Sequence, residues 1–148
     1  MAYCRVSENL AGDYLNMSPT ANMLIKVKNA QIAKADEVVI PFSKMNSEIC
    51  RILKEKDFIK EFEKKKGKVK KVELPFLSVK LKYLDGEGAI SGIKLISRPS
   101  RRIYVGREEI RPVRNGFGLA IFSTSKGLMT GDEAKKTGLG GEFLFEIW

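Results

Sequence analysis

The sequence contains no histidine and only two cysteines, Cys4 and Cys50. Zinc sites usually take four Cys or His ligands, so we expect no metal site. Catalysis by Ser-His-Asp or Cys-His groups is excluded, because both mechanisms use an imidazole as the base. Two cysteines also make no disulfide framework, which indicates a reducing compartment.

Long apolar runs and nucleotide-binding motifs are lacking as well. No run approaches the roughly 20 residues of a membrane-spanning helix, so we expect no membrane partner. Neither a P-loop nor a GxGxxG motif occurs in the sequence. The adjacent carboxylates Glu108–Glu109 and Asp132–Glu133 share no site through spacing alone, because neighbouring side chains diverge in helices and strands alike. We therefore expect a protein that is not an enzyme and that carries no cofactor.

Positive charge is what the sequence has in excess. It holds 27 Lys and Arg against 18 Asp and Glu, a formal net charge of +9. Such an excess predicts a polyanionic partner, with nucleic acid ahead of an anionic membrane surface. A polybasic membrane binder ranks lower, because the lysines are not arranged on an amphipathic helix. A surface that is merely basic is the remaining alternative.

Lysine is concentrated in residues 60–71, KEFEKKKGKVKK, around Gly67. Two interpretations of this segment are open: an arm that binds phosphate groups, and a solvated hairpin loop. A run of like charges is usually a solvated surface, so the loop is the favoured interpretation.

The N-terminal half predicts the element order α-β-α-β-β, a sheet with helices on one side. Ser18-Pro19 combines a hydroxyl cap with a proline suited to the first helical position. Residues 37–42 predict a short strand, and Ser43 can cap a second helix. Residues 77–83 alternate between apolar and polar side chains, which is typical of a half-buried strand.

A subdomain boundary is expected after this strand and its partner. An Asp85-Gly86 turn leads to an expected partner strand around residues 89–96. Residues 97–102 then break the periodicity, and Pro99 disfavours helix before it and supplies no backbone donor. We place the boundary between residues 96 and 97, with 97–102 crossing between the subdomains.

The C-terminal part predicts mostly β-structure with one short helix. We expect strands at residues 103–105, 119–122 and 142–148. Thr130 and Glu133 fit a capping box that begins the helix, and Gly138 suits the left-handed position that ends it. The predicted fold class is therefore α+β, with two small α/β subdomains at residues 17–96 and 97–148 and an N-terminal extension at 1–16.

The segment Ser123–Thr130, STSKGLMT, places three hydroxyls in a row before a lysine and a glycine. Hydroxyls donate and accept hydrogen bonds, so they suit the base edges and 2′-hydroxyls of irregular RNA. Lys126 can neutralise a phosphate, and Gly127 allows a turn to close. If the preceding strand continues, Ser123 and Ser125 face one way and Thr124 the other. From these residues alone an ordinary Ser/Thr-rich turn is favoured over an RNA contact.

Several pieces of the sequence, in this order and spacing, resemble the bacterial-type small-subunit ribosomal protein eight family. They are Ser97-Arg98-Pro99, Arg102-Ile103-Tyr104, Gly116-Phe117-Gly118, Ser123–Gly127, Met129-Thr130 and Gly138–Glu142. Weaker matches extend the resemblance to about residues 17–148. Asp57 stands where the family usually has glycine, Ser18 where it has aspartate, and residues 1–16 and 60–71 match no part of its pattern.

The resemblance implies a structural constituent of the small ribosomal subunit. Members of the family are primary binders of the central domain of small-subunit ribosomal RNA, help the platform assemble and contact neighbouring small-subunit ribosomal proteins. The implied location is the ribosome in the cytoplasm, with an organellar ribosome left open. The alternative is a messenger-RNA-binding translational repressor that acts off the ribosome, and some members bind their own messenger RNA.

The resemblance also marks residues for RNA contact, most of them in the predicted RNA-binding subdomain 97–148. The C-terminal candidates are Ser123, Thr124, Ser125, Lys126, Gly127, Tyr104, Gly140, Gly141 and Glu142. The N-terminal candidates, expected to contact the RNA backbone, are Lys28, Asn29, Ser43 and Lys44.

Overall fold

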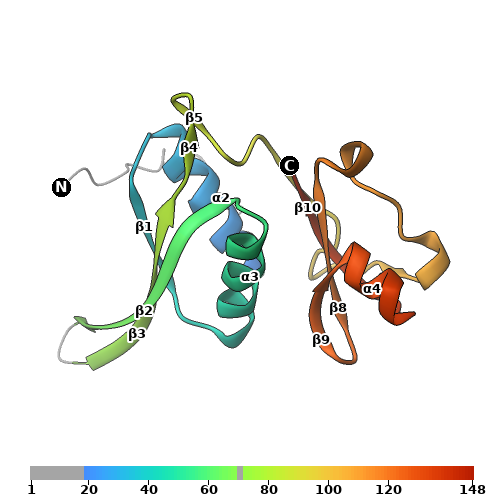
Figure 1. Cartoon of the computed structure of the whole chain (residues 1–148). Coiled ribbons are helices and arrows are strands. Elements are labelled where there is room, and N and C mark those ends of the chain that lie inside the picture. The colour runs from blue at the N-terminus through green and yellow to red at the C-terminus, as the bar shows by residue number, and fades with distance from the viewer. Residues whose placement is uncertain (1–18, 70–71) are drawn as a thin grey trace. The chain divides into compact units, whose positions relative to one another are not determined.

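The computed structural model describes residues 19–69 and 72–148. They divide into two compact units, the first ending at Ala89 and the second spanning Ile90–Trp148 (Figure 1). Both units contain helices and antiparallel sheets, and the second is mostly β-structure with a short helix, so the predicted α+β class is confirmed. The expected extension at residues 1–16 and the expected cap Ser18 lie outside the described residues.

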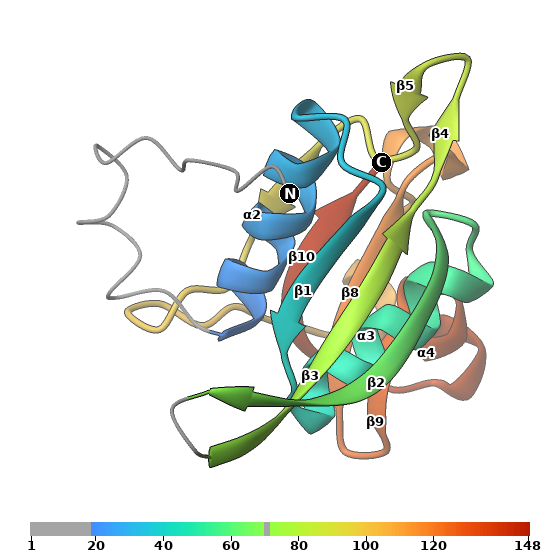
Figure 2. The same cartoon turned by 90° about the vertical axis from the view of Figure 1, so that its left-hand side faces the viewer.

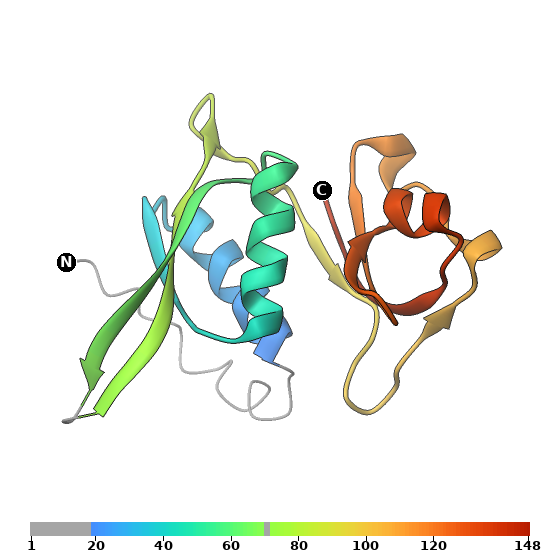
Figure 3. The ribbon, with the colours of Figure 1, turned by 60° about the horizontal axis from the view of Figure 1, so that its bottom comes forward.

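Two helices cover one face of a three-stranded antiparallel sheet in the first unit (Figure 3). The strand order is β1-β3-β2. Apolar residues at helical spacing form the buried face of each helix, among them Leu24 and Val27 in the first and Ile49 and Leu53 in the second. The elements are α2 (Pro19–Ile32), β1 (Glu37–Pro41), α3 (Lys44–Glu55), β2 (Ile59–Val69) and β3 (Val72–Leu81).

The lysine-rich residues 60–69 are part of a largely exposed hairpin, as the favoured interpretation expected, but they form one of its strands and not its loop. Strand β2 pairs with β3 from Ile59↔Leu81 to Val69↔Val72. A Cβ atom on Gly67 would lie 2.8 Å from the Phe76 ring, so the missing side chain leaves room for that ring to cover the strand. The lysine run lacks apolar alternation, which is the signal that reveals a strand in sequence.

The expected pairing of residues 89–96 with the strand at residues 77–83 is wrong. Asp85 and Gly86 make the expected turn, with positive φ angles of 52° and 81°, but it joins only β4 (Tyr83–Leu84) to β5 (Glu87–Gly88). Strand β6 (Ile93–Leu95) instead pairs with β10 (Gly141–Ile147) in the second unit. The division between the units, at residues 89/90, therefore precedes the expected boundary at 96/97. The prediction failed because the local sequence of so short a strand does not reveal which distant strand it pairs with.

Strand β10 is central to the five-stranded sheet of the second unit. It pairs with β6 and β7 along one edge and with β8 along the other, and β8 pairs with β9. The remaining elements are β7 (Tyr104–Val105), η2 (Arg107–Glu109), η3 (Arg114–Gly116), β8 (Leu119–Thr124), β9 (Gly127–Thr130) and α4 (Gly131–Thr137).

Helix α4 begins and ends where the sequence predicts. The Thr130 hydroxyl accepts a hydrogen bond from Glu133 N, and the Glu133 carboxylate accepts one from Thr130 N. Gly138 ends the helix at φ 72°. One face of the sheet packs against this helix through a buried cluster that includes Ala134 and Phe122. The partly buried Phe143 packs against this cluster, and its ring stacks on the Phe122 ring with centroids 4.6 Å apart.

Residues 97–102 form a loop inside the second unit, so their expected role as a crossing between subdomains is wrong. The loop connects β6 to β7, both of which pair with β10. The Ser97 hydroxyl donates to the Phe143 carbonyl oxygen at 2.6 Å and accepts from Ile103 N at 3.0 Å. Ser97 therefore holds the end of the loop against β10.

Across the described ranges, no helix is long and apolar enough to cross a membrane.

The buried face of α3 can be tested through Cys50, which is 1% exposed. Burial raises the pKa of its thiol to about 12, so almost no thiolate, the reactive form, is present at pH 8. In a Cys4→Ser variant, we expect Ellman's reagent to find no reactive thiol in native buffer and full reaction in denaturant. Rapid reaction in native buffer would contradict this packing of α3.

Candidate nucleic-acid interface

The five residues Ser123–Gly127 form the closed end of the β8–β9 hairpin. Ser123 pairs with Leu128 and Thr124 pairs with Gly127, so Ser125 and Lys126 make the turn. The strand therefore ends at Thr124, and the expected alternation through Ser125 does not hold. The cause is Gly127, whose φ of 111° is a conformation that other residues rarely adopt, and which allows the chain to reverse there.

The three hydroxyls of this hairpin have different partners. Thr124 Oγ1 donates to the Gly127 carbonyl oxygen at 2.9 Å and accepts from Lys126 N at 3.2 Å. The Thr124 hydroxyl thus satisfies backbone groups of the turn. In the part of the chain that the structure describes, the hydroxyls of Ser123 and Ser125 have no hydrogen-bond partner. Two of the three hydroxyls are therefore available to a ligand.

Three candidates from three different strands lie in one row across the sheet. Tyr104 of β7 is directly opposite Glu142 of β10, and Glu142 is directly opposite Ser123 of β8. Directly opposite residues share a face and have Cβ atoms about 5 Å apart. Their neighbours Phe122 and Phe143 point into the core on the other face. Tyr104 is 68% exposed, so its ring is open to solvent beside the row.

Gly140 and Gly141 allow β10 to begin between β7 and β8. A Cβ on Gly141 would lie 2.2 Å from the Ser123 carbonyl oxygen, and one on Gly140 would lie 2.6 Å from the Val105 carbonyl oxygen. Both neighbours are backbone atoms, which cannot move without separating the strands. Glycine is thus required at both positions by the protein's own packing.

The structure therefore brings the C-terminal candidates together at one end of the five-stranded sheet, a region that we call the C-terminal surface. Lys126 is exposed at its hairpin end, with no ion pair among the described residues. The sequence analysis did not identify Ser97, whose hydroxyl holds the 97–102 loop against β10. The motif Ser97-Arg98-Pro99 was the signal that could have identified it. The C-terminal surface consists of Tyr104, Ser123, Thr124, Ser125, Lys126, Gly127, Gly140, Gly141 and Glu142.

The N-terminal candidates lie in the first unit and do not form one cluster. Ser43 caps α3 as predicted: its hydroxyl accepts from Asn46 N at 3.0 Å. Lys44 is the exposed first residue of α3. Lys28 and Asn29 are half-buried neighbours on α2, about 100° apart around the helix axis, so they point in different directions.

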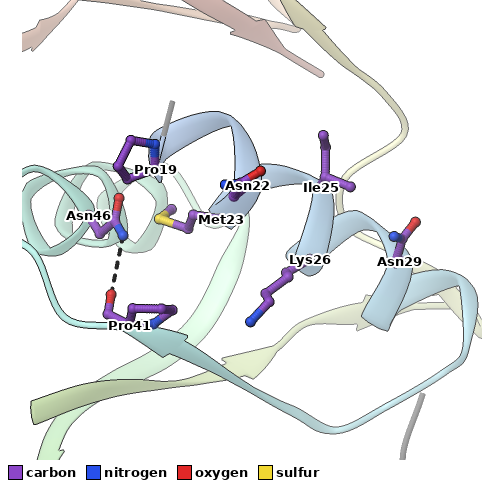
Figure 4. A pocket seen from close by; sticks show the side chains of 8 residues that line it. All are labelled: Pro19, Asn22, Met23, Ile25, Lys26, Asn29, Pro41 and Asn46. Atoms are coloured by element: carbon purple, nitrogen blue, oxygen red, sulfur yellow. Dashed lines mark hydrogen bonds between the residues drawn. The ribbon is translucent and has the colours of Figure 1, made fainter. Parts of the chain in front are cut away.

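A pocket of about 540 Å³ lies between α2 and the segment Pro41–Asn46 (Figure 4). The Asn46 amide donates to the Pro41 carbonyl oxygen at 3.2 Å. The side-chain oxygens of Asn46 and Asn22 are buried there without a partner among the described residues. Of the N-terminal candidates, only Asn29 lines this pocket. Its lining residues are Pro19, Asn22, Met23, Ile25, Lys26, Asn29, Pro41 and Asn46.

Neither unit offers a cluster of metal ligands: within residues 19–69 and 72–148, no three Cys, Asp or Glu side chains are grouped to hold an ion. What the C-terminal surface offers is hydrogen-bonding hydroxyls, an exposed aromatic ring and a lysine. Short hydroxyls, aromatic faces and cationic side chains are the groups with which proteins recognise single-stranded or irregular RNA.

Comparison with known proteins agrees with this chemistry. Residues 18–148 match the family described as "Ribosomal protein S8". The chain is 47% identical over 131 residues to "Small ribosomal subunit protein uS8" of Syntrophobacter fumaroxidans, covering 88% of this chain and 96% of the relative. It is 44% identical over 137 residues to the protein of the same name from Persephonella marina, covering 88% and 97%. The resemblance drawn from sequence motifs is therefore confirmed.

Replacing Gly141 by alanine tests how closely β10 approaches β8. The added Cβ meets the Ser123 carbonyl oxygen, so we expect Gly141→Ala to lower stability by about 1–3 kcal/mol, as overpacking generally does. Gly106→Ala is the matched control, because a Cβ there has only a side-chain atom at 3.9 Å and the backbone φ is −75°. Thermal unfolding of both variants is the measurement. Equal melting temperatures would contradict the close approach.

Proposed function

Because the chain belongs to the ribosomal protein S8 family, it is a non-enzymatic component of the small ribosomal subunit, and we propose that its C-terminal surface binds the central domain of small-subunit ribosomal RNA. In this role it would help the platform of the subunit assemble. The proposal places it in the ribosome of the cytoplasm, beside neighbouring small-subunit ribosomal proteins.

The observation that carries this proposal is the pair of unpartnered hydroxyls on Ser123 and Ser125. Thr124 and Gly127 fix the hairpin that presents them, so little order has to be gained on binding. Each hydroxyl can donate to a base edge or accept from a 2′-hydroxyl. The ring of Tyr104 is exposed, and in this proposal it would stack on an unpaired base.

Charge supports the same proposal. The net charge of +9 favours association with any RNA, and Lys126 adds one cation at the hairpin end. In the first unit, the proposal assigns Lys28, Asn29, Ser43 and Lys44 to contacts with the RNA backbone. A messenger RNA that folds into the same irregular helix would present the same groups, so the protein's own messenger is included as a second RNA partner.

The hydroxyl contacts are tested by Ser125→Ala. The exposed Ser125 side chain makes no intramolecular hydrogen bond in the described structure, so its loss should leave the melting temperature unchanged. On binding, the RNA group that it satisfied would be left unpaired, which costs about 1–3 kcal/mol. Affinity for a central-domain ribosomal RNA fragment should fall, while affinity for a scrambled helix should not. Wild-type affinity for the fragment would contradict the proposal, as would a much lower melting temperature.

Lys126→Ala tests the electrostatic part separately. A phosphate contact is independent of sequence, so this variant should weaken binding to both RNAs similarly. The slope of log K against log salt should decrease by about one. The measurement is a salt titration from 50 to 200 mM on each RNA. An unchanged slope would show that Lys126 does not contact a phosphate.

A further inference from the structure

Three lysines of β2 share one face of the β2–β3 hairpin. Side chains alternate along a strand, so Lys64, Lys66 and Lys68 point to one face and Lys65 points to the other. On β3, Leu77 is opposite Lys64 and is fully buried, so the three lysines continue the face that the helices cover. We call these three residues the lysine stripe.

The stripe begins beside the N-terminal candidates. Lys64 Nζ lies 3.9 Å from the centroid of the Phe42 ring. Phe42 immediately precedes Ser43 and Lys44 in the chain, and its backbone N donates to the Pro75 carbonyl oxygen at 3.3 Å. The stripe therefore begins next to the segment that carries Ser43 and Lys44.

Lysines on the two faces differ in their ion pairs. Lys65, on the opposite face, lies 3.8 Å from Glu37 and 3.6 Å from Glu63. Lys66 and Lys68 form no ion pair within the described residues, although Glu73 is directly opposite Lys68. In the sequence, residues 64–71 hold six lysines and no acidic residue, which equals two-thirds of the formal net charge of +9. Within the stripe, Lys66 and Lys68 therefore carry positive charge that no ion pair of the described residues neutralises.

The β2–β3 hairpin holds Lys66 and Lys68 on an ordered arm that extends beyond the three-stranded sheet. Strand β1 pairs with β3 only as far as Pro41↔Phe76, and beyond that point β2 and β3 continue as two strands (Figure 2). The Phe76 ring packs on Gly67 within this arm. Residues two apart on a strand are about 7 Å apart, so the pairing fixes the spacing of the charges. A preorganised arm loses less conformational entropy on binding than a loop.

We propose that the lysine stripe is a further RNA-binding site that contacts phosphate groups of the RNA backbone, in addition to the C-terminal surface and the N-terminal candidates. Lysine is a compact point charge suited to phosphate, and regularly spaced point charges suit a polyanion. The contacts would be independent of sequence, in contrast to those of Ser123 and Ser125. The inference rests on the proposed function, because RNA is the polyanion that it names.

The test compares two double variants with the same loss of charge. Lys66→Gln/Lys68→Gln neutralises the stripe, and Lys65→Gln/Lys80→Gln neutralises the opposite face, where Lys65 and Lys80 are paired with glutamates. Both are measured in the full-length protein against the central-domain RNA fragment and a scrambled helix, from 50 to 200 mM salt. We expect the stripe variant to lose about two from the salt slope on both RNAs, and about tenfold or more in affinity at 100 mM. The control variant should change the slope much less.

Each outcome decides the proposal. Equal slopes for the two double variants would overturn it, since the stripe would then act only through net charge. If the stripe variant bound RNA as the wild type does, the proposal would also be overturned. The polyanionic partner of the stripe would then be an acidic protein and not RNA. These failures differ from failure of the proposed function, in which the wild-type protein would not distinguish the fragment from the scrambled helix and Ser125→Ala would have no effect. Thermal melts of both variants verify that folding is intact.

Discussion

The close approach of β10 to the backbones of β7 and β8 is the constraint on which the C-terminal surface depends. At Gly141 the space for a side chain is already occupied by the Ser123 carbonyl oxygen, and at Gly140 by that of Val105. Only hydrogen fits between these backbones. Their pairing in turn fixes the register that places Tyr104, Glu142 and Ser123 in one row. The glycines therefore act on the site through the sheet.

Register also decides what each hydroxyl of the hairpin can do. Ser123, Thr124 and Ser125 carry nearly the same group, but only Thr124 is opposite Gly127 and within reach of its carbonyl oxygen. That hydrogen bond occupies the Thr124 hydroxyl, which is then not available to RNA. It also stabilises the turn that presents the hydroxyls of Ser123 and Ser125.

Sequence predicts those features whose cause lies within a few residues. The Ser43 cap, the capping box of Thr130 and Glu133 and the left-handed Gly138 were all correct for this reason. The partner of Ile93–Leu95 and the end of β8 depend on distant strands and on one glycine angle, and sequence did not predict them. The lysine-rich strand β2 could not be predicted for a different reason. Its own residues have a pattern typical of solvated loops, whereas the strand is stabilised by its pairing with β3 and by the Phe76 ring.

The two proposed RNA sites would respond differently to ionic strength, because they rely on different forces. Contacts between lysines and phosphates release counterions, so they weaken steeply as salt rises. Hydrogen bonds of Ser123 and Ser125 act over about 3 Å, well inside the Debye length of about 8 Å at physiological salt, and are little affected. Added salt would therefore weaken the proposed contacts of the lysine stripe with every RNA, and would leave the proposed serine contacts that discriminate among RNAs. Under these two proposals, the lysines of β2 would raise the rate and strength of encounter with RNA, whereas selectivity would depend on the hydroxyls of Ser123 and Ser125 at the end of the β8–β9 hairpin.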